Sequence, residues 1–264
     1  MAARTSIIKP QLKLIFELAK NDFKTRYAGS YLGMFWAFIQ PFMTIAVYWF
    51  VFEVGFRSGS RPDGTPYILW LTCGMIPWFF FSEALLTSSN SFPEYSYLVK
   101  KVSFRIGFLP IVKIISSFFI HLFFLLFLSG ILFYFGYNPD VVYIQVFYYL
   151  FCLFYLLIGI TLITSSLVVF MKDALQVLGI FVQIGFWLIP IVWSPEIISD
   201  KLIKWFKLNP VYYIVEGYRD TFIHHVWFWH RYNQTAYFWI LSTFIMLLGI
   251  YLFKKLKPHF ADVL

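Results

Sequence analysis

The residues that could carry chemistry in this chain are few, and their spacing matches no catalytic pattern. The sequence contains no G-x-x-x-x-G-K-[ST] phosphate loop, G-x-S-x-G elbow, H-E-x-x-H or C-x-x-C motif. His121 is isolated in an apolar run, which is more typical of a packed or hydrogen-bonded side chain than of a ligand. His224, His225 and His230 cluster among aromatic residues without ligand spacing, so interfacial side chains explain them more simply than a metal. We therefore expect no catalytic, cofactor or metal site.

Two carboxylates, Glu53 and Glu83, lie within or beside long apolar runs. Acidic residues at membrane depth are functional candidates by default. Each of these two is only a few residues from an end of its run, so its side chain can reach the interface. A structural role is therefore favoured over a functional one for both.

A short polar and aromatic stretch, residues 91–101, separates two apolar runs and reads SFPEYSYLVKK. Pro93 can open a helix, and the residues after it favour one short amphipathic helix. Such a helix could dock into a groove on a soluble partner. An interfacial loop without a partner has the same composition, and the sequence does not separate the two.

A longer segment, residues 194–235, is too apolar for a free loop and too charged to cross a membrane. Asn209 and Pro210 end one element and start another. Glu216 and Arg219 have the i, i+3 spacing that allows an ion pair on a helix. The pattern predicts two short re-entrant helices that dip into the outer leaflet, where protein buries them.

The rest of the chain is apolar enough to need lipid as its solvent. Of its 264 residues, 60% are hydrophobic and 13% charged, and the mean hydropathy is +0.73. A membrane-spanning helix needs about 20 apolar residues. The sequence predicts an all-α integral membrane protein in one domain, 1–264, with six transmembrane helices at 33–56, 67–86, 106–135, 141–171, 175–193 and 236–253.

Basic residues predict the orientation of these six spans. The net charge is +8, and lysine and arginine concentrate in 1–32, 91–105 and the tail 254–264. The positive-inside rule places these segments, and both termini, in the cytoplasm. Within 10–27, Leu12, Phe16, Ala19 and Phe23 follow a helical period. This predicts an N-terminal amphipathic helix that lies in the membrane interface.

Several short motifs, taken in order, carry a family resemblance that covers nearly the whole chain. They are NDFKTRY (21–27), SYLG (30–33), QP (40–41), VYWFVF (47–52), PYI (66–68), PWFF (77–80), KKVSF (100–104), PIVW (190–193), NPVYY (209–213), GYR (217–219) and FADVL (260–264). The chain resembles the membrane subunit of ABC type-2 exporters of polysaccharides and polyol phosphates, and it is most similar to wall teichoic acid export permeases. Arg105 departs from the pattern, since relatives often have proline there.

The resemblance implies a homodimer in the bacterial cytoplasmic membrane, with two phosphate-loop ATPase subunits beneath it that bind ATP and Mg. It implies no partnership with nucleic acid. The substrate would be a polymer on a polyprenyl diphosphate lipid, a wall teichoic acid first and an O-antigen type polysaccharide as the alternative. The residues implied for contact with the ATPase are Phe92, Glu94, Tyr95, Tyr97, Lys100 and Lys101 in a coupling helix, and Lys172 and Asp173 in a second turn.

A polymer of hydroxyls and phosphates needs a wide path with weak, repeated contacts, and aromatic rings supply these through the C–H faces of sugars. We expect Tyr48, Trp49, Phe181, Phe186 and Trp187 to line that path. Aromatic residues that face lipid or pack together give the same pattern. A membrane transferase acting on lipid-linked sugars would need a cluster of acids or histidines at one interface. A structural or receptor protein would not need the amphipathic, coupling and re-entrant segments together.

Overall fold

The computed structural model describes residues 2–26, 31–56, 64–100 and 105–264, with only the backbone described for 2–10 and 200. Within these ranges the chain consists of helices and their connecting turns, without a strand. Five of the six expected spans are present as helical segments long and apolar enough to cross a membrane. They are Gly33–Gly55, Tyr67–Ser89, Ile106–Tyr134, Val141–Phe170 and Phe228–Val263.

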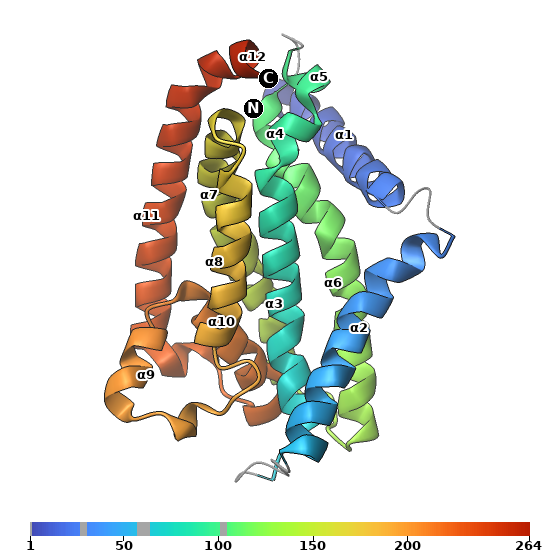
Figure 1. Ribbon diagram of the computed structural model, residues 1–264, viewed down its shortest axis with the longest axis vertical. Helices are drawn as coiled ribbons and strands as arrows, with labels where there is room; N and C mark the ends of the chain where they lie inside the picture. Colours follow the sequence, from blue (N-terminus) through green and yellow to red (C-terminus); the bar gives the residue numbers. More distant parts are fainter. Residues whose placement is uncertain (1, 27–30, 57–63, 101–104) are drawn as a thin grey trace.

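The helices form a bundle with different small elements at its two ends (Figure 1). Helices α1 (Ala2–Arg26), α4 (Ser91–Glu94), α5 (Ser96–Val99) and α12 (Phe260–Val263) lie at the end drawn uppermost, called the upper end here. Helices α9 (Asp200–Phe206) and α10 (Pro210–Arg219) lie at the lower end. The segments expected at the cytoplasmic and the outer side are thus at opposite ends of the molecule.

The long helix α3 (Tyr67–Ser89) is the centre of the core. It packs against α6 (Leu109–Tyr134), α7 (Val146–Phe170) and α10, and most of its side chains are buried. Helix α11 (Tyr232–Leu256) covers the other side of α7. Gly159 and Gly249 let these two backbones approach closely, because a Cβ added to Gly249 would lie 2.5 Å from the Gly159 carbonyl oxygen.

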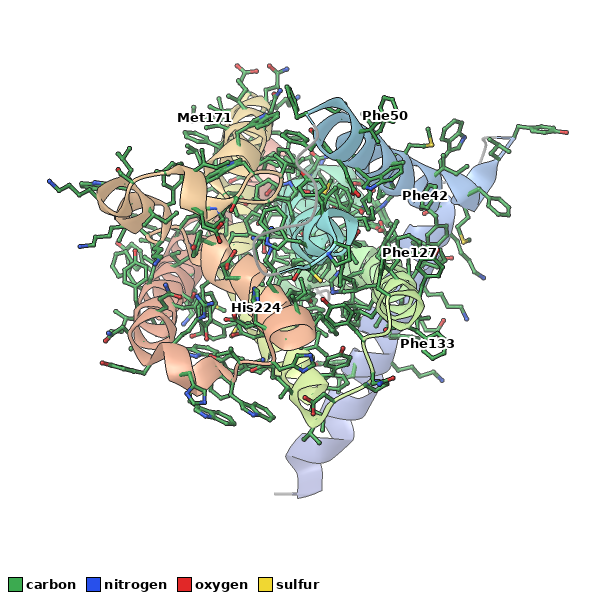
Figure 2. All side chains as sticks on the ribbon, turned by 90° about the horizontal axis from the view of Figure 1, so that it is seen from below. Phe42, Phe50, Phe127, Phe133, Met171 and His224 are labelled. Atoms are coloured by element: carbon green, nitrogen blue, oxygen red, sulfur yellow. The ribbon has the colours of Figure 1, made fainter. Side chains whose placement is uncertain are left out.

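Helix α2 (Trp36–Trp49) stands at the edge of the bundle and buries few side chains. Figure 2 shows Phe42 of α2, and Phe50 just after it, at the periphery, on the same side as Phe127 and Phe133 of α6. The Phe42 and Phe127 rings are 5.7 Å apart, whereas Phe133 is 79% exposed. Exposed apolar side chains of this kind are suited to contact with lipid.

Short helical turns connect or extend these helices. They are η1 (Gly33–Phe35), the π-helical η2 (Phe50–Gly55), η3 (Ile106–Phe108), η4 (Val141–Gln145), η5 (Pro195–Ile197), the π-helical η6 (Asp220–His224), η7 (Phe228–Arg231) and η8 (Lys257–His259).

The structure corrects several of the expected boundaries. The fifth expected span, 175–193, is the 15-residue helix α8 (Ala174–Leu188), which ends early because Pro190 holds the preceding Ile189 in an extended conformation. Helix α1 begins at Ala2 rather than Pro10, because the residues before the proline include alanines, which favour a helix. The last span begins at Tyr232 instead of Ala236, and the expected tail 254–264 is largely helical.

Candidate functional site

A cleft of about 690 Å³ runs between α2 and α8, with α3 as its floor. Its lower part is aromatic and is formed by Tyr48, Trp78, Phe186 and Trp187. The Tyr48 ring lies 5.5 Å from that of Phe186, which lies 5.9 Å from Trp78. This part of the cleft is therefore lined by aromatic rings.

Polar side chains also line the cleft, among further apolar ones. They are Gln40 and Thr44 on α2, Ser82, Glu83 and Thr87 on α3, Gln183 on α8 and Arg26 at the end of α1. The combination of ring faces with dispersed amides and hydroxyls can bind a polyhydroxylated molecule through many weak contacts.

Three of the five aromatic residues expected along the path, Tyr48, Phe186 and Trp187, line this cleft. Trp49 and Phe181 do not. Phe181 is 67% exposed, and Trp49 is 36% exposed, on other faces of their helices. All five aromatics lie on α2 or α8, and the sequence did not indicate which side of each helix faces α3.

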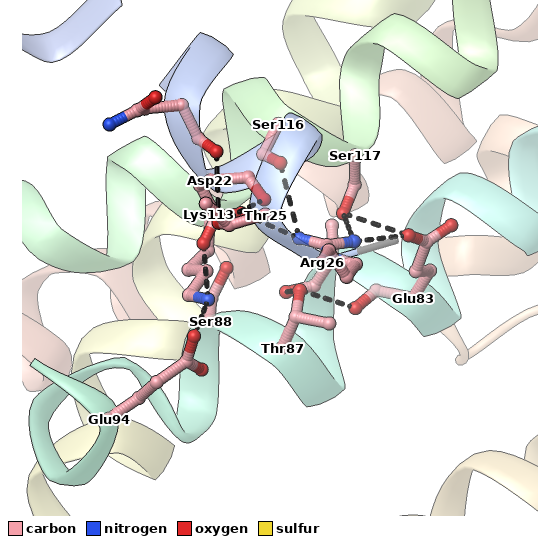
Figure 3. A network of polar contacts seen from close by, with 12 residues as sticks. Asp22, Thr25, Arg26, Glu83, Thr87, Ser88, Glu94, Lys113, Ser116 and Ser117 are labelled. Atoms are coloured by element: carbon pink, nitrogen blue, oxygen red, sulfur yellow. Dashed lines mark hydrogen bonds and ion pairs between the residues drawn. The ribbon is translucent and has the colours of Figure 1, made fainter. Parts of the chain in front are cut away.

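A network of charged side chains from four helices (Figure 3) includes Arg26 and Glu83, which line the upper part of the cleft. Arg26 donates to Glu83 at 2.5 Å and to Asp22 at 2.9 Å. Lys113 of α6 donates to Asp22 and to Glu94, each at 2.5 Å. We call this alternating series, Glu94–Lys113–Asp22–Arg26–Glu83, the ion chain.

Asp22 is the centre of the ion chain and is almost fully buried. Its Oδ1 atom also accepts a hydrogen bond from Tyr95 at 2.7 Å. Burial alone would raise the pKa of Asp22, but hydrogen bonds and the charge of Lys113 outweigh it and hold the pKa below the usual 3.8. Burial, followed by the bond to Asp22, raises the pKa of Tyr95. Asp22 is therefore a carboxylate held ionised inside the protein.

Sequence reasoning missed Lys113 and did not give Asp22 a role. Two signals were available. Lys113 is a charged residue inside an expected span, which marks it as a functional candidate. Asp22 follows Ile15 and Ala19 at helical spacing, and these three form the buried face of α1 against α6. The apolar Leu12 and Phe16, by contrast, are 61% and 52% exposed.

The expected coupling helix is split into α4 and α5, because the backbone leaves the helical region at Tyr95, whose hydroxyl bonds to Asp22. Phe92 is fully buried against Phe253 and Phe260, so it anchors the segment to the C-terminal helices. Within 91–100, the exposed side chains are those of Glu94 in α4, Tyr97 in α5 and Lys100 after α5, and together they make up the exposed face of the segment. We call this face the docking face.

The remaining residues expected to contact an ATPase are Lys101, Lys172 and Asp173. Lys101 lies outside the described residues. Lys172 and Asp173 are exposed in the turn between α7 and α8, which is also at the upper end (Figure 1). The upper end thus presents two exposed polar elements side by side with α12.

At the lower end, Asn209 caps α10 by accepting from the Val211 backbone N–H at 2.9 Å, and Pro210 occupies the first turn. The expected pair is present: Arg219 donates to Glu216 at 2.5 Å. Arg219 is fully buried, donates to the Ile191 carbonyl at 3.2 Å, and stacks 3.6 Å from the Trp70 ring centroid. These contacts join α10, α3 and the chain that follows α8.

The clustered histidines have no common site. His225 pairs with Asp140 at 2.9 Å, and the Trp227 and Trp229 rings stack on each other with their centroids 4.5 Å apart. Within the described ranges, no group of three His, Cys, Asp or Glu side chains is placed to hold a metal ion.

Comparisons with known proteins identify the family. The model of the ABC-2 type transporter family matches residues 13–223. Two proteins of Klebsiella pneumoniae, each called O-antigen export system permease protein RfbA, are 24% and 23% identical over 260 residues, which cover 95% of this chain and 95% of each relative. A protein of the same name from Myxococcus xanthus is 25% identical over 227 residues, covering 80% of this chain and 81% of the relative. Because the family match extends from α1 to η6, through the cleft and the ion chain, this multi-pass membrane chain belongs to the ABC-2 type transporter family.

Proposed function

We propose that this chain is the permease subunit of an ATP-driven exporter that moves a lipid-linked cell-envelope polysaccharide of the O-antigen type. The observation that carries the proposal is similarity over 95% of both chains to O-antigen export permeases. A wall teichoic acid is the second candidate, and it is favoured only by the resemblance of the short motifs.

The cleft supports a polysaccharide as the substrate. Sugar rings expose C–H faces that stack on aromatic rings, and their hydroxyls exchange hydrogen bonds with amides and hydroxyls. Tyr48, Trp187 and Gln183 offer both kinds of contact within one cleft. Contacts that are individually weak let a long polymer advance, whereas one tight site would hold it.

In the proposed assembly, two copies of this chain span the cytoplasmic membrane with the upper end and both termini in the cytoplasm. Each copy crosses the membrane six times, with α8 as the fifth span. A 15-residue helix covers only ~22 Å of a hydrocarbon layer of ~30 Å. The irregular segment 189–193 completes that crossing. Irregular backbone is tolerated at membrane depth where protein buries it, and Arg219 and Tyr67 bind the carbonyls of Ile191 and Val192.

Helices α9 and α10 are then re-entrant elements of the outer leaflet. Val211–Ile223 is buried without a break, which is expected of backbone shielded from lipid by protein. Exposed Leu202 and Trp205 of α9 would contact the outer interface.

ATP and Mg would bind to two separate phosphate-loop ATPase subunits, and the docking face together with Lys172 and Asp173 would receive them. Glu94, Tyr97 and Lys100 offer an acid, a ring and a base on one exposed face, which fits a polar groove on a soluble protein. The diphosphate lipid of the substrate would remain in the membrane beside the cleft.

The test is deletion of this gene in its host, followed by analysis of the cytoplasmic membrane. The proposal expects a polyprenyl diphosphate-linked polysaccharide to accumulate, and export to return with the wild-type chain. A Tyr97→Ala variant should restore export poorly while remaining in the membrane in normal amount. Accumulated polymer built on polyol phosphate would establish the teichoic acid instead, and unchanged lipid-linked polymers would refute the exporter.

A further inference from the structure

We propose that Asp22 and Lys113 are positioning residues that transmit engagement of the docking face to the Arg26–Glu83 ion pair at the upper end of the cleft. This inference rests on the proposed function, because it concerns how an ATPase partner controls the same cleft.

The ion chain has the geometry of a link between two surfaces. Its terminal carboxylates reach solvent: the Glu94 side chain is 47% exposed at the docking face, and the Glu83 side chain is 29% exposed in the cleft. At the centre, Lys113 and Asp22 are each 3% exposed, and Arg26, next to Glu83, is 18% exposed. Within the ion chain, the docking face and the cleft are therefore connected through the buried Asp22–Lys113 pair.

Each cation in the ion chain is shared between two carboxylates. Lys113 bridges Glu94 and Asp22, and Arg26 bridges Asp22 and Glu83. Movement of Glu94 therefore alters the electrostatic attraction between Lys113 and Asp22. This in turn alters the attraction between Asp22 and Arg26. Such coupling is strong in a buried site because few water molecules screen the charges.

The docking element has a second, independent contact with the same centre. Tyr95, between α4 and α5, donates to Asp22 Oδ1, and the Lys113 ammonium lies 5.0 Å from the centroid of its ring. If α4 and α5 rotated on binding a partner, Tyr95 and Glu94 would move together, and both contact the Asp22–Lys113 pair.

At its other end, the ion chain acts on the wall of the cleft. Arg26 is the last residue of α1, and it fastens the end of α1 to Glu83 of α3 and to Ser116 of α6. Arg26 and Glu83 line the cleft together with Trp36 and Gln40 of α2, the opposite wall, and the span that contains α2 is the least buried of the five long spans. The Arg26–Glu83 pair is therefore placed to set how closely the α2 wall approaches α3.

The experiment uses a thiol reporter in the cleft of the complete complex with its ATPase. Ser82→Cys places the thiol beside Glu83, and Cys73 and Cys152 are buried, so the chain without the reporter gives the background. The rate of maleimide labelling is measured without nucleotide and after trapping with ATP, Mg and vanadate. In the otherwise wild-type chain, trapping should change this rate several-fold.

The deciding variant is Asp22→Asn with Lys113→Met, which removes one charge of each sign and leaves no unpaired partner at the buried centre. It should assemble and hydrolyse ATP, but trapping should no longer change the labelling rate. Lys20→Met, on the exposed face of α1, is the matched control and should keep the full response. Lys113→Met alone would leave the buried Asp22 carboxylate without its ammonium partner and could prevent folding. The double variant avoids this, so the test stays valid if the single variant misfolds.

The possible outcomes separate this inference from the proposed function. A full response in the double variant would overturn the role of the ion chain and leave the exporter intact. Failure of the wild-type chain to form a complex with an ATPase would overturn the exporter and the positioning role together, whereas a wild-type complex that hydrolyses ATP but shows no response to trapping would overturn the positioning role alone.

Discussion

Replacement of Arg219 is the sharpest test of how the lower end is held together. The guanidinium is fully buried, and it contacts Glu216, the Ile191 carbonyl and the Trp70 ring at once. Gly74 leaves the space for it, because a Cβ at position 74 would lie 2.7 Å from Nη2 of Arg219. Arg219→Met removes the charge and all three interactions while it keeps most of the volume.

The expected cost follows from the partner left behind. Breaking a buried ion pair by removing one member costs about 3–5 kcal/mol, because the other charge stays buried and uncompensated. The Glu216 side chain is only 12% exposed, so solvent can compensate little of that cost. For a chain of this size, 1 kcal/mol corresponds to ~2–4 °C in melting temperature, so Arg219→Met should melt roughly 6–20 °C lower.

The assay is intrinsic tryptophan fluorescence during heating of the purified protein in detergent. Glu216→Gln combined with Arg219→Met should recover part of the loss, since no lone charge remains. Arg219→Lys should fall between, because an ammonium cannot reproduce the planar stack on Trp70. Lys204→Met on exposed α9 is the control. If Arg219→Met melts with the wild type, the ion pair and ring contact do not hold α10.

Three further perturbations have defined outcomes. Because the pKa of Asp22 is lowered in the folded state, its ionisation stabilises the protein above the unfolded pKa and this contribution is lost as the pH falls below 3.8; melting curves of wild type and Asp22→Asn, well separated at pH 7, should converge in acid. Gly249→Ala should lower the melting temperature, since its Cβ would meet the Gly159 carbonyl, whereas Gly179→Ala, with open space around it, should not. Trp187→Ala should reduce polymer export several-fold in cells, while Phe181→Ala, outside the cleft, should export normally.

The sequence was most informative where one local property decides the structure. Five spans and the Glu216–Arg219 pair could be predicted, because apolar length and helical spacing are local quantities. The end of α8 could also have been predicted, since Pro190 disfavours a helical conformation for the residue before it. The break between α4 and α5 at Tyr95 could not be predicted, because it accompanies a hydrogen bond to Asp22, 73 residues away in the chain. Likewise, the Asp22–Lys113 pair joins residues 91 positions apart, and no periodicity encodes that contact.

The placement of the buried ions indicates which helices move during transport. Two ion networks fasten other helices onto α3: Arg26 ties α1 to Glu83, and Arg219 ties α10 to Trp70. In the most apolar stretch of α3, 78% of residues are buried, against 11% for the span that contains α2. A helix that exchanges buried contacts pays a large desolvation cost, whereas a lipid-facing helix slides against a solvent of equal polarity. Movement that widens the cleft is therefore expected in α2 relative to a fixed unit of α3, α7 and α10, and the Arg26–Glu83 pair of the ion chain lines the cleft between them.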